Sequence, residues 1–186
     1  MFVAHAITWA AFAPAAVLLL DRFRETDAME SDAADRRLQF GLWAWTWRLA
    51  AIAAIYVLIY VVFGALVAWR APEVRSFYEN VRMPGPGLIV LTQVGRGLLW
   101  AAIAVPVVAM MRGSRSQVII ATGVLFGVVM SAALLLPNPL LPRDVRMVHL
   151  VETVSSDFLF GLITAWILTV RGRAKVSARP RRPPAR

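Results

Sequence analysis

Cysteine is absent from this chain of 186 residues, and histidine occurs only twice. Without cysteine the protein has no disulfide framework, no thiolate metal site and no cysteine nucleophile. The sequence also contains no phosphate-binding glycine loop and no G-x-S-x-G turn around a nucleophilic serine. These absences leave no catalytic residue to assign, so we expect a protein that is not an enzyme.

Charged residues are also scarce, at 17% of the chain, whereas hydrophobic residues make up 59%. An ordinary soluble domain is about half apolar even when glycine is counted, so this composition favours the lipid bilayer as the solvent. The net charge of +9 does not indicate a nucleic-acid partner. The basic residues gather in loops and in the C-terminal tail rather than on one folded face.

Five apolar runs are long enough to cross a bilayer, which requires about 20 residues. They cover residues 2–20, 42–69, 88–111, 118–136 and 147–170. No positive charge precedes the first run, as it would in a secretory signal, so we expect this run to be retained. The sequence therefore predicts an all-α integral membrane helical bundle of about five transmembrane helices, forming one domain over residues 1–170.

The polar segments between the runs predict the orientation. Residues 21–40 read as a cytoplasmic loop, residues 70–87 read as an outer loop ending in the helix breaker PGPG, and the basic, proline-containing tail 171–186 reads as disordered. Most lysine and arginine residues fall on the side of the 21–40 loop and the tail. This asymmetry predicts an inner (cytoplasmic) membrane protein with its N-terminus outside and its C-terminus in the cytoplasm.

The last apolar run carries a stripe of polar residues at helical spacing. Ionisable side chains that face lipid near the bilayer centre cost at least about 2.5 to 3.5 kcal/mol, so the stripe should face other helices or a wet cavity. Arg96 in the third run lies at about the same depth as Asp157, which makes the two residues candidate partners. We therefore predict a buried polar cluster of Arg96, Glu152, Asp157, His149, Gln93 and Ser156.

Two interpretations of this cluster stay open. It locks the helices together through hydrogen bonds, or it carries a proton or a ligand, because desolvation favours a neutral carboxyl group. His5 and His149 both begin apolar runs on the outer side, and two imidazoles from different helices are suitable axial ligands for haem or chlorophyll. A zinc site at His149 and Glu152 lacks a third ligand, so we predict no metal site.

Three segments carry a resemblance to known proteins: VGRGLLW (94–100), LLLPNPLLP (134–142) and VRMVHLVETVSSDFLFG (145–161). The chain resembles a group of uncharacterised bacterial polytopic membrane proteins, mainly over residues 60–161. The resemblance implies a bacterial origin and a fold of several spans, and it transfers no catalytic residue. The group carries an amide where this chain has Asp157, which implies that a charge is not required there.

Three functions are compatible with these features. The small size and the absence of nucleotide and catalytic motifs favour a non-enzymatic accessory or structural subunit of a larger bacterial membrane complex, such as an energy-transducing one. The alternatives are a small proton- or ion-coupled transporter that uses the Arg/Glu/Asp cluster, and a haem- or chlorophyll-binding subunit. In each case the partners of this protein would be the lipid bilayer and other membrane proteins.

Residues 72–75 and 143–146 share a three-residue acid-Val-Arg pattern, which is too short to indicate an internal repeat.

Overall fold

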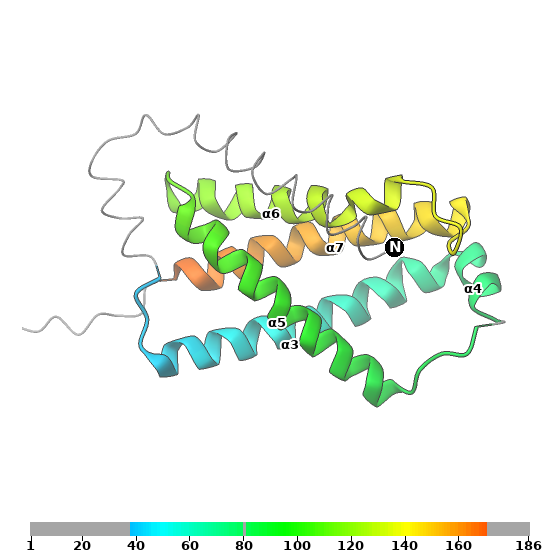
Figure 1. The fold of residues 1–186 in the computed structure, drawn as a ribbon, viewed down its shortest axis with the longest axis horizontal. Coiled ribbons are helices and arrows are strands. Elements are labelled where there is room, and N and C mark those ends of the chain that lie inside the picture. The colour runs from blue at the N-terminus through cyan, green and yellow to red at the C-terminus, as the bar shows by residue number, and fades with distance from the viewer. Residues whose placement is uncertain (1–37, 80, 171–186) are drawn as a thin grey trace, which may run out of the picture.

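A computed structural model describes residues 38–79 and 81–170 of the chain, and these residues form helices and no strand (Figure 1). Four helices in this part are long and apolar enough to cross a membrane. They are α3 (Leu42–Leu66) with the 3-10 turn η1 (Ala68–Arg70), α5 (Pro86–Met110), α6 (Arg115–Ser131) with the 3-10 turn η2 (Ala132–Leu135), and α7 (Arg143–Thr169). The predicted all-α membrane fold is confirmed. The predicted first span (2–20) and the tail (171–186) lie outside the described residues.

A further short helix, α4 (Pro72–Glu79), lies within the segment 70–87, which the sequence predicted to be a loop. Val74 in this helix is 1% exposed and packs in a cluster with Ala68 and Val145. Burying this side chain stabilises a helix whose other residues are mostly polar. The prediction of a continuous loop was therefore wrong over these eight residues.

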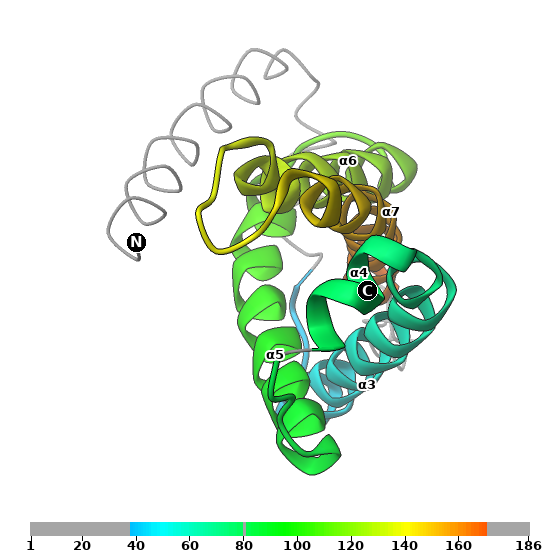
Figure 2. The ribbon, with the colours of Figure 1, turned by 90° about the vertical axis from the view of Figure 1, so that its right-hand side faces the viewer.

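The same cluster brings together the two segments that share an acid-Val-Arg pattern. Val74 belongs to the first segment and Val145 to the second, and both are almost fully buried. The cluster sits at one end of the bundle, where α4 packs against the start of α7 (Figure 2). The two valines thus belong to one buried cluster at this end of the bundle.

Helices α6 and α7 lie side by side along their length (Figure 1). Glycine makes this possible, because Gly123 and Gly127 of α6 and Gly161 of α7 all face the partner helix. A Cβ atom on Gly161 would come within 2.8 Å of the Thr122 carbonyl oxygen. Small residues at such a crossing allow helix backbones to approach closely, as is common in membrane proteins.

Helix α5 instead crosses α3 obliquely (Figure 1). The helices approach most closely at Gly97, where an added Cβ would lie 2.9 Å from the Tyr56 Cβ and 3.1 Å from the Ala53 Cα. In the view along the bundle, α5 lies on one side, with α3 and α7 on the other (Figure 2). Contact between α5 and α6 is slight, so α5 is held mainly by α3.

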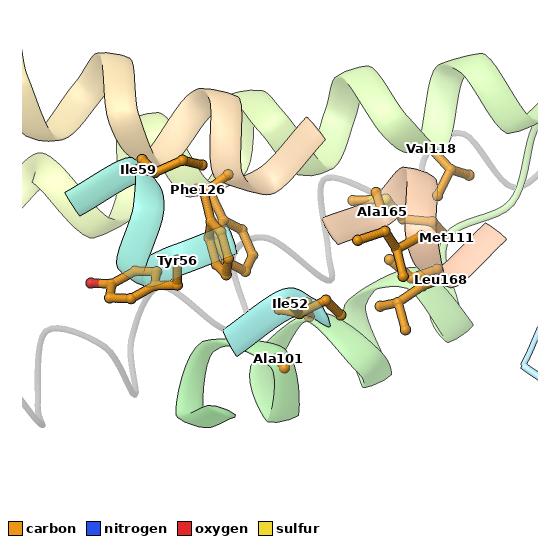
Figure 3. Close-up of a cluster of buried hydrophobic side chains, with 13 residues drawn as sticks. Ile52, Tyr56, Ile59, Ala101, Met111, Val118, Phe126, Ala165 and Leu168 are labelled. Atoms are coloured by element: carbon orange, nitrogen blue, oxygen red, sulfur yellow. The ribbon is translucent and has the colours of Figure 1, made fainter. Parts of the chain in front are cut away.

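Aromatic side chains join the helices at the centre of the bundle. The ring of Phe160 in α7 lies 5.0 Å from that of Tyr56 in α3 and 6.0 Å from that of Phe126 in α6. Tyr56 and Phe126 lie in the same cluster as Ile52 and Ala101, which adds α5 to the core (Figure 3). The Tyr56–Phe160 contact is edge-to-face, an arrangement that is favourable beyond the area that it buries.

Arg48 closes the opposite end of the bundle. It is 2% exposed, and its guanidinium donates from Nε to the Ile167 carbonyl at 3.3 Å and from Nη2 to the Val170 carbonyl at 2.9 Å. The last carbonyl groups of a helix have no donor within the helix, and a cation there also interacts favourably with the helix dipole. Arg115 adds a hydrogen bond from Nε to the Thr169 hydroxyl at 3.2 Å.

Candidate functional site

His149 and Glu152 form a hydrogen-bonded pair on α7. The distance between His149 Nδ1 and Glu152 Oε2 is 2.8 Å, and Glu152 is 9% exposed. Their i, i+3 spacing places both side chains on one face of the helix, as the sequence predicted. In the tautomer that carries its proton on Nδ1, His149 donates to the Glu152 carboxylate and leaves Nε2 as an acceptor.

Aromatic residues that the sequence did not single out surround this pair. The ring of Tyr78 in α4 makes an edge contact with His149 at 6.3 Å and also packs against Trp69 at 5.6 Å. Burial raises the pKa of the Tyr78 hydroxyl above its ordinary value, and nearby Tyr60 and Glu152 raise it further. The Tyr78 hydroxyl therefore stays protonated at neutral pH and is available as a hydrogen-bond donor.

Glu152 also reaches α3. A Cβ atom built on Gly64 would lie 3.8 Å from Glu152 Oε1, which places the carboxylate directly against the backbone of that helix. A methyl group at position 64 would therefore be in ordinary van der Waals contact with the carboxylate. Gly64 was not predicted as a site residue, because a single glycine in an apolar run gives no signal of what it faces.

Asp157 lies deeper on α7 and is 6% exposed. Both Arg96 and Glu152 are close enough to act on its carboxyl group electrostatically. Across residues 38–79 and 81–170, however, Arg96 forms no ion pair with either acid. Its guanidinium donates from Nη1 to the side-chain oxygen of Gln93 at 3.4 Å instead.

Arg96 is exposed, so it is not a buried member of the cluster as the sequence predicted. Its guanidinium carbon lies 5.8 Å from the centre of the Tyr56 ring, at the outer limit of a cation–π contact. Gln93 is buried, at 6% exposure. Ser156 does not support the acids, because its hydroxyl donates to the Thr153 carbonyl of its own helix at 3.2 Å.

The predicted cluster thus divides into two parts along α7. The outer part is the His149–Glu152 pair beneath α4. The deeper part contains the buried Asp157, while Arg96 on α5 is exposed, bonds to Gln93 and acts on that carboxyl group only electrostatically. Buried acids of this kind can hold or pass a proton, whereas neither part presents a nucleophile aligned with a base.

Only His149 of the two histidines in the axial-ligand hypothesis lies in the described part of the chain. His5 lies outside the described residues. The Nε2 atom of His149 is buried without a hydrogen-bond partner. In the described part of the chain, no three His, Cys, Asp or Glu residues are grouped closely enough to hold a metal ion. The pairing of His5 with His149 around a haem or chlorophyll therefore stays a prediction.

Comparison with known proteins assigns no role to these residues. No family model, curated protein or solved structure matches the chain. The chemistry of the site therefore rests on the geometry of its own side chains. The two features with the clearest consequences are the acids within α7 and the exposed arginine of α5.

Proposed function

We propose that this chain is a non-enzymatic accessory or structural subunit of a larger bacterial membrane complex. The exposed side chain of Arg96 carries the proposal. At about 1.5 Å per residue, Arg96 lies roughly 15 Å from the start of α5, which is about half the thickness of a bilayer core of about 30 Å. A guanidinium that faced lipid there would be costly, so a protein surface that can accept its hydrogen bonds should cover it.

The residues around Arg96 support a helix as that covering element. Thr92, Gly95 and Leu99 are exposed on the same side of α5, and together with Arg96 we call them the Arg96 face. A Cβ atom built on Gly95 would meet nothing within 4 Å, so another helix has room to approach closely. Small residues and a hydrogen-bonding side chain are the features that drive helix association in membranes.

Purification from the source membrane in mild detergent tests this proposal. We expect the wild-type protein to co-elute with fixed partners, and Arg96→Leu to release them, because leucine removes the guanidinium and is compatible with lipid. Arg82→Leu, at an exposed residue outside the helices, is the matched control and should leave co-elution unchanged. A single small species in the wild-type preparation would overturn the proposal. The visible spectrum of the same preparation reports any haem or chlorophyll.

A second candidate function is proton- or ion-coupled transport. The observation in its favour is that Glu152 and Asp157 are both buried within α7, one below the other, with a histidine bonded to the outer acid. We expect Glu152→Gln to abolish a proton flux in liposomes, because the amide cannot take up a proton. Glu79→Gln, at an exposed acid of α4, should keep the flux. Equal flux in both variants would remove Glu152 from any transport mechanism.

A further inference from the structure

Arg146 is a buried cation without a counter-charge. Its side chain is 9% exposed, and its Nε atom is buried without a hydrogen-bond partner. Within the described ranges the one ion pair joins His149 to Glu152, so it does not neutralise Arg146. Removing a guanidinium from water without pairing it is unfavourable, and a bound anion would relieve that cost.

The start of α7 provides the other half of an anion site. The residue before the helix is Pro142, which supplies no side-chain cap, so the N–H groups of the first turn lack side-chain acceptors. Helical side chains tilt toward the N-terminus, which directs the long side chain of Arg146 back toward that turn. Asp144 in the same turn is exposed. An arginine beside an uncapped helix N-terminus is a suitable arrangement for a phosphate group.

The position of Arg146 indicates where such a phosphate would come from. The preceding residue, Val145, packs against Ala68 at the end of α3, next to the exposed Trp69. Tryptophan at the end of a membrane helix marks the level of the lipid headgroups. The segment before α7 also exposes large apolar side chains, with Leu136 at 54% and Leu140 at 68%. These leucines suit contact with acyl chains, which a free phosphate ion does not have.

We infer that Arg146 and the first turn of α7 bind the phosphate of an anionic phospholipid headgroup, with Leu136 and Leu140 against its acyl chains. His149 adds a preference among headgroups. It lies one helical turn further on, about 5 to 6 Å away between Cβ atoms, and its buried Nε2 has no hydrogen-bond partner, so it can accept one in the tautomer with the proton on Nδ1. A glycerol hydroxyl donates such a bond, whereas a choline group has no donor. The site therefore favours phosphatidylglycerol over phosphatidylcholine.

Titration of the delipidated full chain in detergent tests the inference. The ligands are short-chain phosphatidylglycerol, short-chain phosphatidylcholine and inorganic phosphate, and native mass spectrometry counts the molecules bound to each chain. We expect one phosphatidylglycerol per chain, held about tenfold more tightly than phosphatidylcholine or inorganic phosphate. Equal affinity for the two lipids would overturn the inference, and this comparison needs no variant.

Two variants locate the site. Arg146→Gln should weaken phosphatidylglycerol binding about tenfold, whereas Arg143→Gln, at an exposed arginine in the same helix start, should change it less than about twofold. If inorganic phosphate binds as well as the lipid and both depend on Arg146, the anion site stands and its ligand is the free ion. The inference would be overturned if Arg146→Gln and Arg143→Gln bound phosphatidylglycerol equally well, or if the wild-type chain bound neither phosphatidylglycerol nor inorganic phosphate. Arg146→Lys, which keeps the charge, covers the case in which Arg146→Gln does not fold, and should retain part of the affinity.

Discussion

Three arginines near or within the membrane spans have three different environments. Arg48 is buried and bonded to helix carbonyls, Arg96 is exposed beside a buried glutamine, and Arg146 is buried without a partner. From the sequence, Arg48 counted only as a basic residue that sets orientation. Its actual role could not be predicted, because its carbonyl partners lie 119 and 122 residues further along the chain.

Replacing Arg48 should destabilise the fold. Arg48→Leu would remove the donors from the carbonyls of Ile167 and Val170 and leave them unsatisfied in a buried place. Hydrogen bonds to charged groups contribute about 1.5 to 3 kcal/mol each, so we expect the loss of these two bonds to lower the free energy of unfolding by about 3 to 6 kcal/mol. Denaturant unfolding in detergent, followed by circular dichroism, measures the change.

Arg112→Leu is the control for this prediction, because Arg112 is an exposed arginine at the end of the neighbouring helix. A surface substitution of this kind changes stability by no more than about 0.5 kcal/mol. If Arg48→Leu and Arg112→Leu lowered the free energy of unfolding by similar amounts, the effect at Arg48 would come from its charge and not from its hydrogen bonds to α7.

The polar residues of the candidate site show which part of a membrane site a sequence can predict. The pairing of His149 with Glu152 depends only on helical spacing within α7, and the structure forms that pair. The pairing of Arg96 with Asp157 depended on depth and also on how α5 and α7 are rotated about their axes. Depth follows from the length of each span, whereas rotation depends on packing with neighbouring helices. The structure places Arg96 on the exposed side instead.

At the scale of whole helices, the membrane spans were predictable and the short helix was not. The ends of the four described spans agree with the predicted ranges to within a few residues, because the bilayer sets how many apolar residues a span needs. Helix α4 has only eight residues, and its apolar side chains Val74, Phe77 and Tyr78 follow helical spacing over only five of them, which is too short a window for a period to be recognised. Its stability comes from contact with Val145, far away in the sequence.

The close packing of α6 on α7 predicts opposite effects of alanine at two glycines. Gly161→Ala would place a methyl group 2.8 Å from the Thr122 carbonyl oxygen and 3.0 Å from the Gly123 Cα, so the two backbones would have to separate. We expect a loss of about 1 to 3 kcal/mol in unfolding free energy. Gly95→Ala meets open space and should stabilise α5 by up to about 1 kcal/mol through helix propensity. Thermal unfolding in detergent compares the two variants, and destabilisation by both would contradict the packing described here.

At the scale of the whole molecule, the four described spans place the start of α3 and the end of α7 on the same side of the membrane. That side also carries Arg48 and Arg115, and on the positive-inside pattern we propose that it is cytoplasmic. The loop containing α4 would then be outside. Composition predicted this arrangement through loop charge, but charge alone does not establish the orientation.

Cysteine labelling tests the orientation, and the absence of native cysteine makes every label specific. A membrane-impermeant maleimide should label Ser76→Cys in intact spheroplasts, because residue 76 is exposed in α4, on the side that we propose to be outside. Ser116→Cys, exposed at the start of α6, should be labelled only after lysis. The reverse pattern would establish the opposite orientation.

The oblique crossing of α5 on α3, closest at Gly97, has a consequence for motion. Helices α6 and α7 touch along their length, whereas α5 touches α6 only slightly, so we expect α5 to swivel about Gly97 more readily than α6 separates from α7. Such a swivel changes the direction of Arg96 and leaves the packing of α6 on α7 intact. Hydrogen exchange should therefore be faster in α5 than in α7, and a partner that binds Arg96 should slow exchange in α5 alone.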